Sequence, residues 1–221
     1  RHPLGKAKRI KMSNPYNINA PACISFSGGR TSGYMLHHIL QAYDGRLPDH
    51  YHVLFADTGK EHPATYDFIR ECAERWRIKI EWLAMDHEGY DTPFDALIAR
   101  KKYLPNPRTR FCTEYLKIRP IRAFMKARGY DRWANIVGLR ADEPGRVKKA
   151  LDRCTKFYTS VAPLWEAGVT KDMVMDWWSR QPFDLRAPEG CGNCIGCFMK
   201  GRDTLIATEQ RHPGSLAWWA E

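Results

Sequence analysis

Apolar and polar positions follow two alternating patterns along this chain. Short apolar runs rich in strand-forming residues predict four buried strands, at 22–26, 51–56, 78–83 and 133–139. After the first two runs, apolar residues recur every three or four positions, which predicts amphipathic helices. Strands that alternate with helices of about 10 to 15 residues favour an α/β fold with a parallel sheet and helices on both faces.

Proline and capping residues set the expected limits of the helices. Pro63 begins the helix after the second strand, and Thr170 caps another that runs through residue 180. Residues 84–112 hold three prolines, which predicts surface loops with a short helix near 93–100. A basic helix is expected over 118–128.

The composition fits one core-forming domain with a small appendage. The chain has 221 residues, of which 43% are hydrophobic, and it contains no run of 18 apolar residues. These features exclude fibrous proteins and predict a cytoplasmic protein without a membrane partner. We expect a flexible arm or expression remnant at 1–11 and an α/β domain at 12–160. A helical segment with a cysteine-rich loop is expected at 161–221.

A glycine-rich loop follows the first predicted strand. Residues 27–32 read Ser-Gly-Gly-Arg-Thr-Ser and lead directly into the first predicted helix. The glycines let the backbone approach an anion, the hydroxyls donate hydrogen bonds, and the helix N-terminus attracts negative charge. The spacing matches neither a Walker A loop nor a dinucleotide fingerprint. We predict a phosphate-binding loop in which Arg30 adds an ionic contact, with a structural turn as the alternative.

Positive charge is concentrated in one segment of the chain. The net charge is +10, and residues 100–156 alone hold 17 basic and 5 acidic residues. Such a segment favours a polyanionic partner such as a nucleic acid or a phosphorylated nucleotide, whereas a solvated helix face is the alternative. The candidate polyanion-binding residues are Arg108, Arg110, Arg119, Arg122 and Lys126, of which the last three share one helix face.

Three of the seven cysteines lie close together in the sequence. The spacing Cys-x2-Cys-x2-Cys is typical of a loop that wraps an iron–sulfur cluster, here with Cys191, Cys194 and Cys197. Zinc is the alternative, although zinc sites usually take two ligands from each of two knuckles. Residues 198–221 contain no cysteine, so a fourth ligand is distant or absent. Cys23 and Cys72 are expected to be small core residues.

Four segments, the first of which includes the glycine-rich loop, carry a family resemblance. They read SFSGGRTS, FADTGKEHPAT, RFCTEYLKIRP and GLRADEPGR, at 25–32, 55–65, 110–120 and 138–146. In this order they resemble the PP-loop ATP pyrophosphatases and phosphoadenosine phosphosulfate (PAPS) reductases, over residues 22–221. Many of the pyrophosphatases have Asp at the position of Thr31. A threonine at this position is nearer to the PAPS reductase-like branch. The resemblance implies a PP-loop α/β sandwich.

The resemblance also implies roles for individual residues. The nucleotide-binding residues would be Ser25, Ser27, Gly28, Gly29, Arg30, Thr31, Ser32, Asp57, Thr58, Gly59, Gly138 and Arg140. Catalysis would rest on Arg30, Lys117 and Asp142, together with Mg²⁺. Cys112 matches the Cys-Thr position that pairs with a downstream cysteine trio in the iron–sulfur branch, so it is the first candidate for the fourth ligand of a [4Fe-4S] cluster. Cys154 is the second candidate.

Three functions are compatible with these patterns. The leading hypothesis, implied by the resemblance, is ATP-dependent sulfur transfer to a nucleic acid, as in DNA phosphorothioation or base thiolation, with a sulfur donor such as a cysteine desulfurase. The first alternative is a PAPS reductase that releases sulfite. The chain lacks the C-terminal Glu-Cys-Gly-Leu-His motif of those reductases, although a tail beyond Glu221 could be missing. The second alternative is a nucleotide-sensing iron–sulfur module that binds nucleic acid without catalysis.

Overall fold

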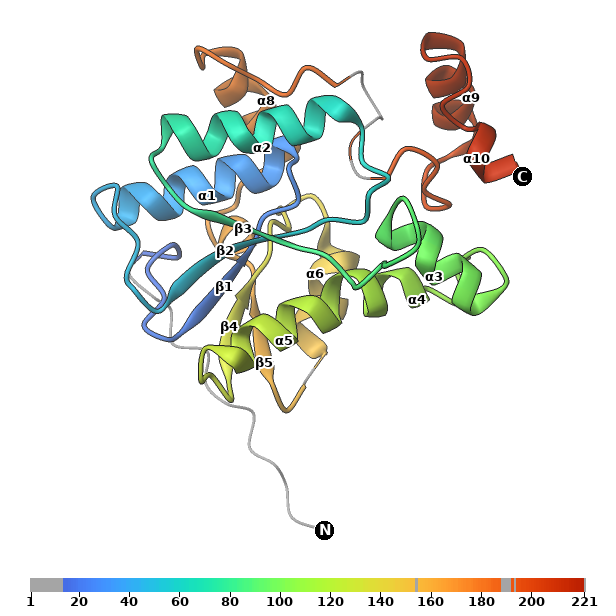
Figure 1. Cartoon of the computed structure of the whole chain (residues 1–221). Helices are drawn as coiled ribbons and strands as arrows, with labels where there is room; N and C mark the ends of the chain where they lie inside the picture. Colours follow the sequence, from blue (N-terminus) through green and yellow to red (C-terminus); the bar gives the residue numbers. More distant parts are fainter. Residues whose placement is uncertain (1–13, 154, 188–191, 193, 221) are drawn as a thin grey trace.

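A parallel sheet of five strands forms the centre of the fold. The computed structural model describes residues 14–153, 155–187, 192 and 194–220. The strands are β1 (Ala22–Ser25), β2 (Tyr51–Ala56), β3 (Ile80–Leu83), β4 (Trp133–Ile136) and β5 (Tyr158–Val161). They lie in the order β3-β2-β1-β4-β5, and all four pairs are parallel. The predicted α/β class with a parallel sheet is therefore confirmed (Figure 1).

Helices cover both faces of this sheet. One face carries α1 (Arg30–Ala42), α2 (Pro63–Arg75) and α8 (Lys171–Ser179), whereas α5 (Arg119–Ala127) lies on the other (Figure 1). On the first face, Ile24, Met35, Phe68 and Trp178 are at most 2% exposed and belong to one apolar cluster. Burial of apolar surface on both sides explains why the strands are apolar almost throughout.

The predicted strand limits need small corrections. The run at 51–56 is confirmed as β2, but the third strand begins at Ile80 and the fourth ends at Ile136. The fourth strand stops early because the amide of Leu139 turns back to bond the carbonyl of Val137. This turn directs residues 138–140 away from the sheet, toward the end of β1.

The helix starts at Pro63 and after Thr170 are confirmed. Pro63 is the first residue of α2, and the Thr170 hydroxyl accepts a hydrogen bond from the amide of Met173 at 3.4 Å. A short helix, α3 (Pro93–Lys101), lies where it was expected, and the Thr92 side chain caps it. Two elements had no prediction, namely α6 (Pro144–Asp152) and β5. Their short apolar stretches stand between charged residues and give no clear periodicity.

Helical turns precede the predicted basic helix at 118–128. A helical turn, α4 (Phe111–Thr113), and a π-helical turn (Glu114–Ile118) continue directly into α5. α5 itself begins at Arg119, within one residue of the prediction, so the expected basic helix is confirmed. Pro120 is accommodated in its first turn, where the helix follows a change of pitch. Single π-turns recur at functional sites, and this one contains Lys117.

The C-terminal part is helical, as expected. It contains α7 (Pro163–Glu166), α8, α9 (Arg202–Arg211) and α10 (Ala217–Ala220). Leu164 and Trp178 belong to the same buried cluster as β1 and α1, so the first part of this segment completes the main core. The division at residue 160 stays a prediction. No helix in the described part of the chain has the length and apolarity to cross a membrane.

The contact between α1 and α8 gives a test of this packing. A Cβ atom at Gly33 would lie 2.7 Å from Cζ2 of the buried Trp178, whereas one at Gly145 in α6 would meet open space. Gly33→Ala should lower the free energy of unfolding by about 1–3 kcal/mol, because overpacking outweighs the gain in helix propensity.

Gly145→Ala is the matched control, and its free energy of unfolding should stay equal or rise by about 0.4–1 kcal/mol. Both values come from urea unfolding followed by circular dichroism. Equal stabilities of the two variants would contradict this account of the α1–α8 contact.

Candidate nucleotide site and cysteine cluster

A large cavity lies beyond the carboxyl ends of β1 and β4. Chain connections leave these neighbouring strands in opposite directions, and such a point is where open α/β sheets bind ligands. The cavity has a volume of about 1440 Å³. Its walls include the predicted glycine loop, residues 138–140, Lys117 and parts of α8 and α9.

Steric and polar contacts fix the glycine loop. Gly28 has φ +71°, and a Cβ atom there would lie 2.6 Å from Cγ2 of Thr65, so no larger residue fits without displacement. The Ser32 hydroxyl accepts hydrogen bonds from the amides of Ser27 and Gly29 at 3.3 and 3.2 Å. Ser32 thereby holds the turn that leads into α1, and the N-terminus of α1 opens on the cavity.

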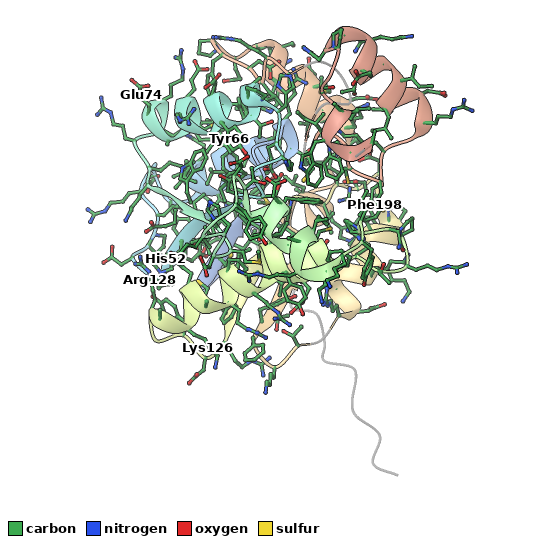
Figure 2. All side chains as sticks on the ribbon, turned by 45° about the vertical axis from the view of Figure 1, so that its right-hand side comes forward. His52, Tyr66, Glu74, Lys126, Arg128 and Phe198 are labelled. Atoms are coloured by element: carbon green, nitrogen blue, oxygen red, sulfur yellow. The ribbon has the colours of Figure 1, made fainter. Side chains whose placement is uncertain are left out.

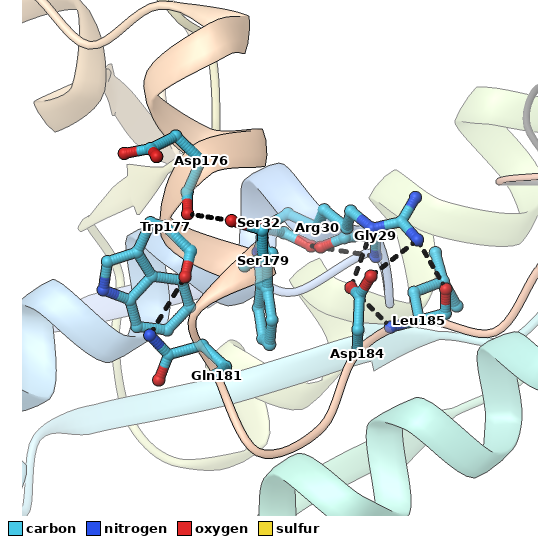
Figure 3. Close-up of polar contacts among 10 residues, drawn as sticks. Gly29, Arg30, Ser32, Asp176, Trp177, Ser179, Gln181, Asp184 and Leu185 are labelled. Atoms are coloured by element: carbon cyan, nitrogen blue, oxygen red, sulfur yellow. Dashed lines mark hydrogen bonds and ion pairs between the residues drawn. The ribbon is translucent and has the colours of Figure 1, made fainter.

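The Arg30 side chain points to the C-terminal segment of the chain. Its Nε and Nη2 atoms donate to the Asp184 carboxylate at 2.7 and 2.8 Å, and Nη2 also donates to the carbonyl of Leu185 (Figure 3). The guanidinium thus ties residues 184–185 to the glycine loop. The predicted direct contact of Arg30 with phosphate would require exchange of this partner, and it stays a prediction.

Arg140 connects the two loops at the end of the sheet. Its Nη1 donates to the Thr31 hydroxyl at 3.1 Å, and its other nitrogens donate to the Asp142 carboxylate at 2.9 and 3.1 Å. These bonds from Arg140 hold the pKa of Asp142 below its usual value. Glu143 pairs with Arg140 and Arg146. Asp142 therefore fits the positioning of Arg140 better than a magnesium ligand or a catalytic acid, and its catalytic role stays a prediction.

The segment after β2 forms a buried polar network. Asp57 Oδ1 accepts from the amide of Gly59 at 2.8 Å and from the hydroxyl of Tyr66 at 3.0 Å. Thr58 donates through its amide and hydroxyl to Glu61, which is 5% exposed. Burial raises the pKa of Tyr66, and the nearby Glu61 and Asp57 carboxylates raise it further, so its hydroxyl stays a donor at neutral pH.

The cysteine-rich loop is attached to this network. The amide of Ile195 donates to the carbonyl of Lys60 at 2.8 Å, and Glu61 and Cys194 form an antiparallel bridge. Cys194 Sγ lies 3.2 Å from the Thr58 hydroxyl. A loop more than 130 residues away in sequence is thus held at the end of β2.

Cys112 and Cys194 each lie within electrostatic range of Cys197. Both also interact with the ammonium group of Lys117. Cys191 and Cys154 lie outside the described residues, and within the described residues no three Cys, His, Asp or Glu side chains form a metal-holding group. The structure therefore places Cys112 within electrostatic range of Cys197 but not in a metal-holding group with the described members of the trio, and its role as the fourth ligand stays a prediction.

Burial keeps these thiols protonated. It raises the pKa of Cys194 to about 12, with the Glu61 carboxylate adding to the effect, and it also raises the pKa of Cys112. Cys23 and Cys72 are 0% exposed, which confirms that they are core residues. A buried thiol is a weak nucleophile, but a metal ion can displace its proton.

An ion pair braces the cysteine-rich region. Lys60 Nζ lies 2.8 Å from Asp95 Oδ1 and 3.9 Å from the ring centroid of Trp218. Trp218 and Trp219 pack on Phe94 of α3, so the helical tail is fixed to the same side of the molecule as Lys60. These tryptophans act as docking aromatics.

The predicted polyanion-binding residues divide into separate groups. Arg119 pairs with Glu114 at 3.2 Å and stacks on Tyr115, whereas Arg122 and Lys126 lie over Phe157. Figure 2 shows Lys126 at the outer edge of the molecule. Arg108 and Arg110 are exposed in the loop before α4. The five residues line the outer surface, and their binding role stays a prediction.

Sequence reasoning missed the cations that line the cavity beside Lys117. They are Arg146, Lys171 and Arg211. Lys171 begins α8, and a cation at a helix N-terminus is unfavourable unless it meets negative charge, which is a signal that could have drawn attention to it. Arg211 comes from the last turn of α9, and no sequence signal connects it with the glycine loop.

A parallel sheet with a glycine loop at its topological switch point defines a nucleotide-binding class of α/β protein. Residues 21–181 match the model of the phosphoadenosine phosphosulfate reductase domain, so the chain belongs to this family. The predicted resemblance is confirmed.

Two relatives are similar in sequence. The chain is 35% identical over 206 residues to the nin region protein ORF290 of Escherichia phage lambda, covering 82% of this chain and 67% of the phage protein. It is 27% identical over 194 residues to a protein of Methanocaldococcus jannaschii, covering 85% of this chain but only 38% of that protein.

Two solved structures share the fold. The PAPS reductase of Candida auris superposes with a TM-score of 0.50 and 18% identity, over 72% of this chain and 71% of the reductase. The U34-tRNA thiolase NcsA of Methanococcus maripaludis, solved with its [4Fe-4S] cluster, superposes with a TM-score of 0.53 and 19% sequence identity. The match covers 90% of this chain and 70% of the thiolase.

The Lys60–Asp95 ion pair predicts that the free energy of unfolding depends on pH. Burial raises the pKa of Asp95, but hydrogen bonds from Lys60 and Thr92 and the Lys60 charge outweigh it, so the pKa is lowered overall. A carboxyl with a lowered folded-state pKa stabilises the protein above its unfolded pKa of about 4 and loses that contribution as the pH falls through the folded value.

The difference in unfolding free energy between the unmodified chain and Asp95→Asn should therefore be constant from pH 6 to 8 and shrink below about pH 4. Asp67→Asn removes an exposed pair with Arg70 and serves as the control, with a small effect throughout. A difference for Asp95→Asn that grows on acidification would show that the brace does not act through the ionised carboxylate.

Proposed function

We propose that this chain is an ATP pyrophosphatase of the PAPS reductase-like family that activates a nucleic acid for sulfur transfer, with a [4Fe-4S] cluster. One observation carries the proposal. Lys117 lines the same cavity as the glycine loop and also interacts electrostatically with Cys112 and Cys194. A single cation is therefore within reach of both a bound nucleotide and the cysteines, which suits a reaction that joins nucleotide chemistry to sulfur chemistry.

The glycine loop and the N-terminus of α1 suit the binding of pyrophosphate. The loop amides and the helix dipole attract anions, and Arg140 braces Thr31 at the start of the helix. In the proposed reaction an oxygen of the acceptor attacks the α-phosphorus of ATP, and the bond to the bridging oxygen of the β-phosphate breaks. Pyrophosphate leaves with the electron pair, and the charge is stabilised by the loop and Lys117.

Sulfur then replaces the adenylate. A hydrosulfide, released from the donor's persulfide by a thiol reductant that is itself oxidised to a disulfide, forms a bond to the activated acceptor atom. The bond from that atom to the oxygen of AMP breaks, so that AMP leaves with the electron pair. The donor class is hypothesised to be a cysteine desulfurase. Mg²⁺ would enter with the nucleotide, because Asp142 and Glu143 at this edge are already paired with arginine.

The cysteines fit a cluster. Cys112 and Cys194 are each within electrostatic range of Lys117 and Cys197, and with Cys191 these cysteines would supply up to four thiolates. NcsA, which shares the fold and is a tRNA thiolase with a [4Fe-4S] cluster, supports this combination of fold, cluster and nucleic-acid substrate.

Positive charge around the cavity supports a nucleic-acid acceptor. Arg146, Lys171 and Arg211 surround the cavity, and the described part of the chain shows no ion pair to Lys117, Lys171 or Arg211. Unpaired cations at a cavity with a glycine loop suit a polyanionic ligand. The basic residues of the 108–126 segment would extend this surface.

One assay separates the proposed function from its alternatives. The anaerobically reconstituted protein is incubated with ATP or PAPS, and pyrophosphate and sulfite are measured. We expect pyrophosphate from ATP, with at least a tenfold increase on addition of the nucleic-acid acceptor. Lys117→Met should lower this rate about tenfold to a thousandfold, because a charge that stabilises the transition state is lost.

Sulfite from PAPS would support the reductase instead, and nucleotide binding without either product would support the non-catalytic module. Lys102→Met is the matched control for the Lys117 variant. It removes an exposed lysine of the loop after α3 and should keep the rate.

The assignment of Cys112 as a ligand has its own test. Cys112→Ser should lose the absorbance near 400 nm and most of the iron, because a thiolate ligand is removed. Cys72→Ala is the control and should keep a full cluster, since Cys72 lies in the apolar core with α1 and α2.

The measurements are the absorption spectrum and the iron and zinc content per chain. If Cys112→Ser keeps the whole cluster, the fourth ligand is a residue other than Cys112. Stoichiometric zinc without the absorbance would replace the iron–sulfur assignment with a zinc site.

A further inference from the structure

Two side chains of the segment after β2 touch the thiol of Cys194. The Thr58 hydroxyl lies 3.2 Å from Sγ, and Glu61 Oε1 lies 3.7 Å from it. Thr58 is 0% exposed and Glu61 is 5% exposed. Since Cys194 belongs to the proposed cluster ligands, these contacts form the immediate surroundings of one ligand sulfur.

The hydrogen bonds of Glu61 leave the Thr58 hydroxyl able to change its acceptor. Glu61 Oε2 receives the amide of Thr58 at 3.2 Å and the hydroxyl of Tyr66 at 3.3 Å. Thr58 Oγ1 lies within hydrogen-bond distance of both Glu61 oxygens and of Cys194 Sγ, but it carries one proton. When Cys194 is a thiolate, Thr58 can donate to the sulfur while Glu61 keeps the amide of Thr58 and shares the Tyr66 hydroxyl with Asp57.

The Glu61 carboxylate has no cation beside it. Across the described ranges of the chain, no Lys, Arg or His nitrogen lies within 4.0 Å of Glu61, and its nearest groups are Thr58, Tyr66 and Cys194. A buried carboxylate without a counterion is costly unless hydrogen bonds and function retain it. Its charge therefore acts at short range on Cys194.

We propose that Thr58 and Glu61 are positioning residues for the cluster ligand Cys194, with Thr58 donating a hydrogen bond to its sulfur and Glu61 orienting Thr58 and placing negative charge beside the site. The inference rests on the proposed function, because it requires a cluster at Cys194. Groups around a metal ligand set its orientation and tune the metal. Hydrogen bonds to the sulfurs and nearby charge set the potential of an iron–sulfur cluster.

The two residues have opposite electrostatic effects. A hydrogen bond to the sulfur stabilises the reduced, more negative cluster and raises its potential, whereas the carboxylate disfavours that state and lowers the potential. A purely structural role would give no reason for opposite signs. The same network reaches the nucleotide motif, because the Tyr66 hydroxyl also donates to Asp57 Oδ1 at 3.0 Å.

The test is a redox titration of the reconstituted full chain, followed by electron paramagnetic resonance. Thr58→Val removes the donor at nearly constant volume and should lower the midpoint potential, and Thr58→Ser should restore it. Glu61→Gln should raise the potential. Thr58→Val should also increase the rate of iron loss to a chelator about tenfold, since a group that orients the ligand is lost.

Thr65→Val is the matched control. Thr65 is 1% exposed, lies near the same segment, and its hydroxyl has no hydrogen-bond partner among the described residues. The cluster of Thr65→Val should have the same midpoint potential and the same rate of iron loss as that of the unmodified chain. Circular dichroism checks folding, and Thr58→Ala replaces Thr58→Val if the latter does not fold.

The possible results are distinguishable. Opposite shifts for the Thr58 and Glu61 variants, with rescue by Thr58→Ser, support the inference. The inference is overturned if Thr58→Val and Glu61→Gln both keep the midpoint potential of the unmodified chain, or shift it only as far as Thr65→Val does. The proposed function is not affected by that result. Failure of the unmodified chain to assemble any cluster overturns the cluster part of the proposed function and the inference with it.

Discussion

The close approach of the glycine loop to α2 and α8 is the constraint on which the site depends. Gly28 leaves no room between the loop and Thr65, and Gly33 leaves none between α1 and Trp178. The indole nitrogen of Trp178 also donates to the carbonyl of Arg30 at 2.8 Å. Because the backbone is confined from both sides, the amides at the start of α1 can face an anion without reorganisation when it binds.

Acidic side chains pair with the arginines that support the loops, whereas Lys117, Lys171 and Arg211 at the same cavity have no acidic partner among the described residues. Asp184 pairs with Arg30, and Asp142 pairs with Arg140. Both arginines therefore have structural partners, and their predicted contact with phosphate competes with these pairs. Lys117 has no such partner among the described residues, which makes it the cation best placed to respond to a ligand.

The fold and the nucleotide loop could be predicted from the sequence because their signals are local. Apolar strands, the glycines at 28 and 29, Pro63 and Thr170 each act within a few residues of their own position. The Arg30–Asp184 pair and the contact of Thr58 with Cys194 could not be predicted in this way. They join residues brought together by packing, separated by as many as 154 positions.

The burial of the cysteines distinguishes a metal ligand from a free nucleophile. A sulfonucleotide reductase needs a thiolate at neutral pH, yet desolvation raises the pKa of Cys194 to about 12 and also raises that of Cys112. Lys117 lowers both values but does not overcome burial. Iron compensates for the loss of a proton through the metal–sulfur bond, so a buried, protonated pair that is unsuited to attack on sulfur is suited to bind a cluster.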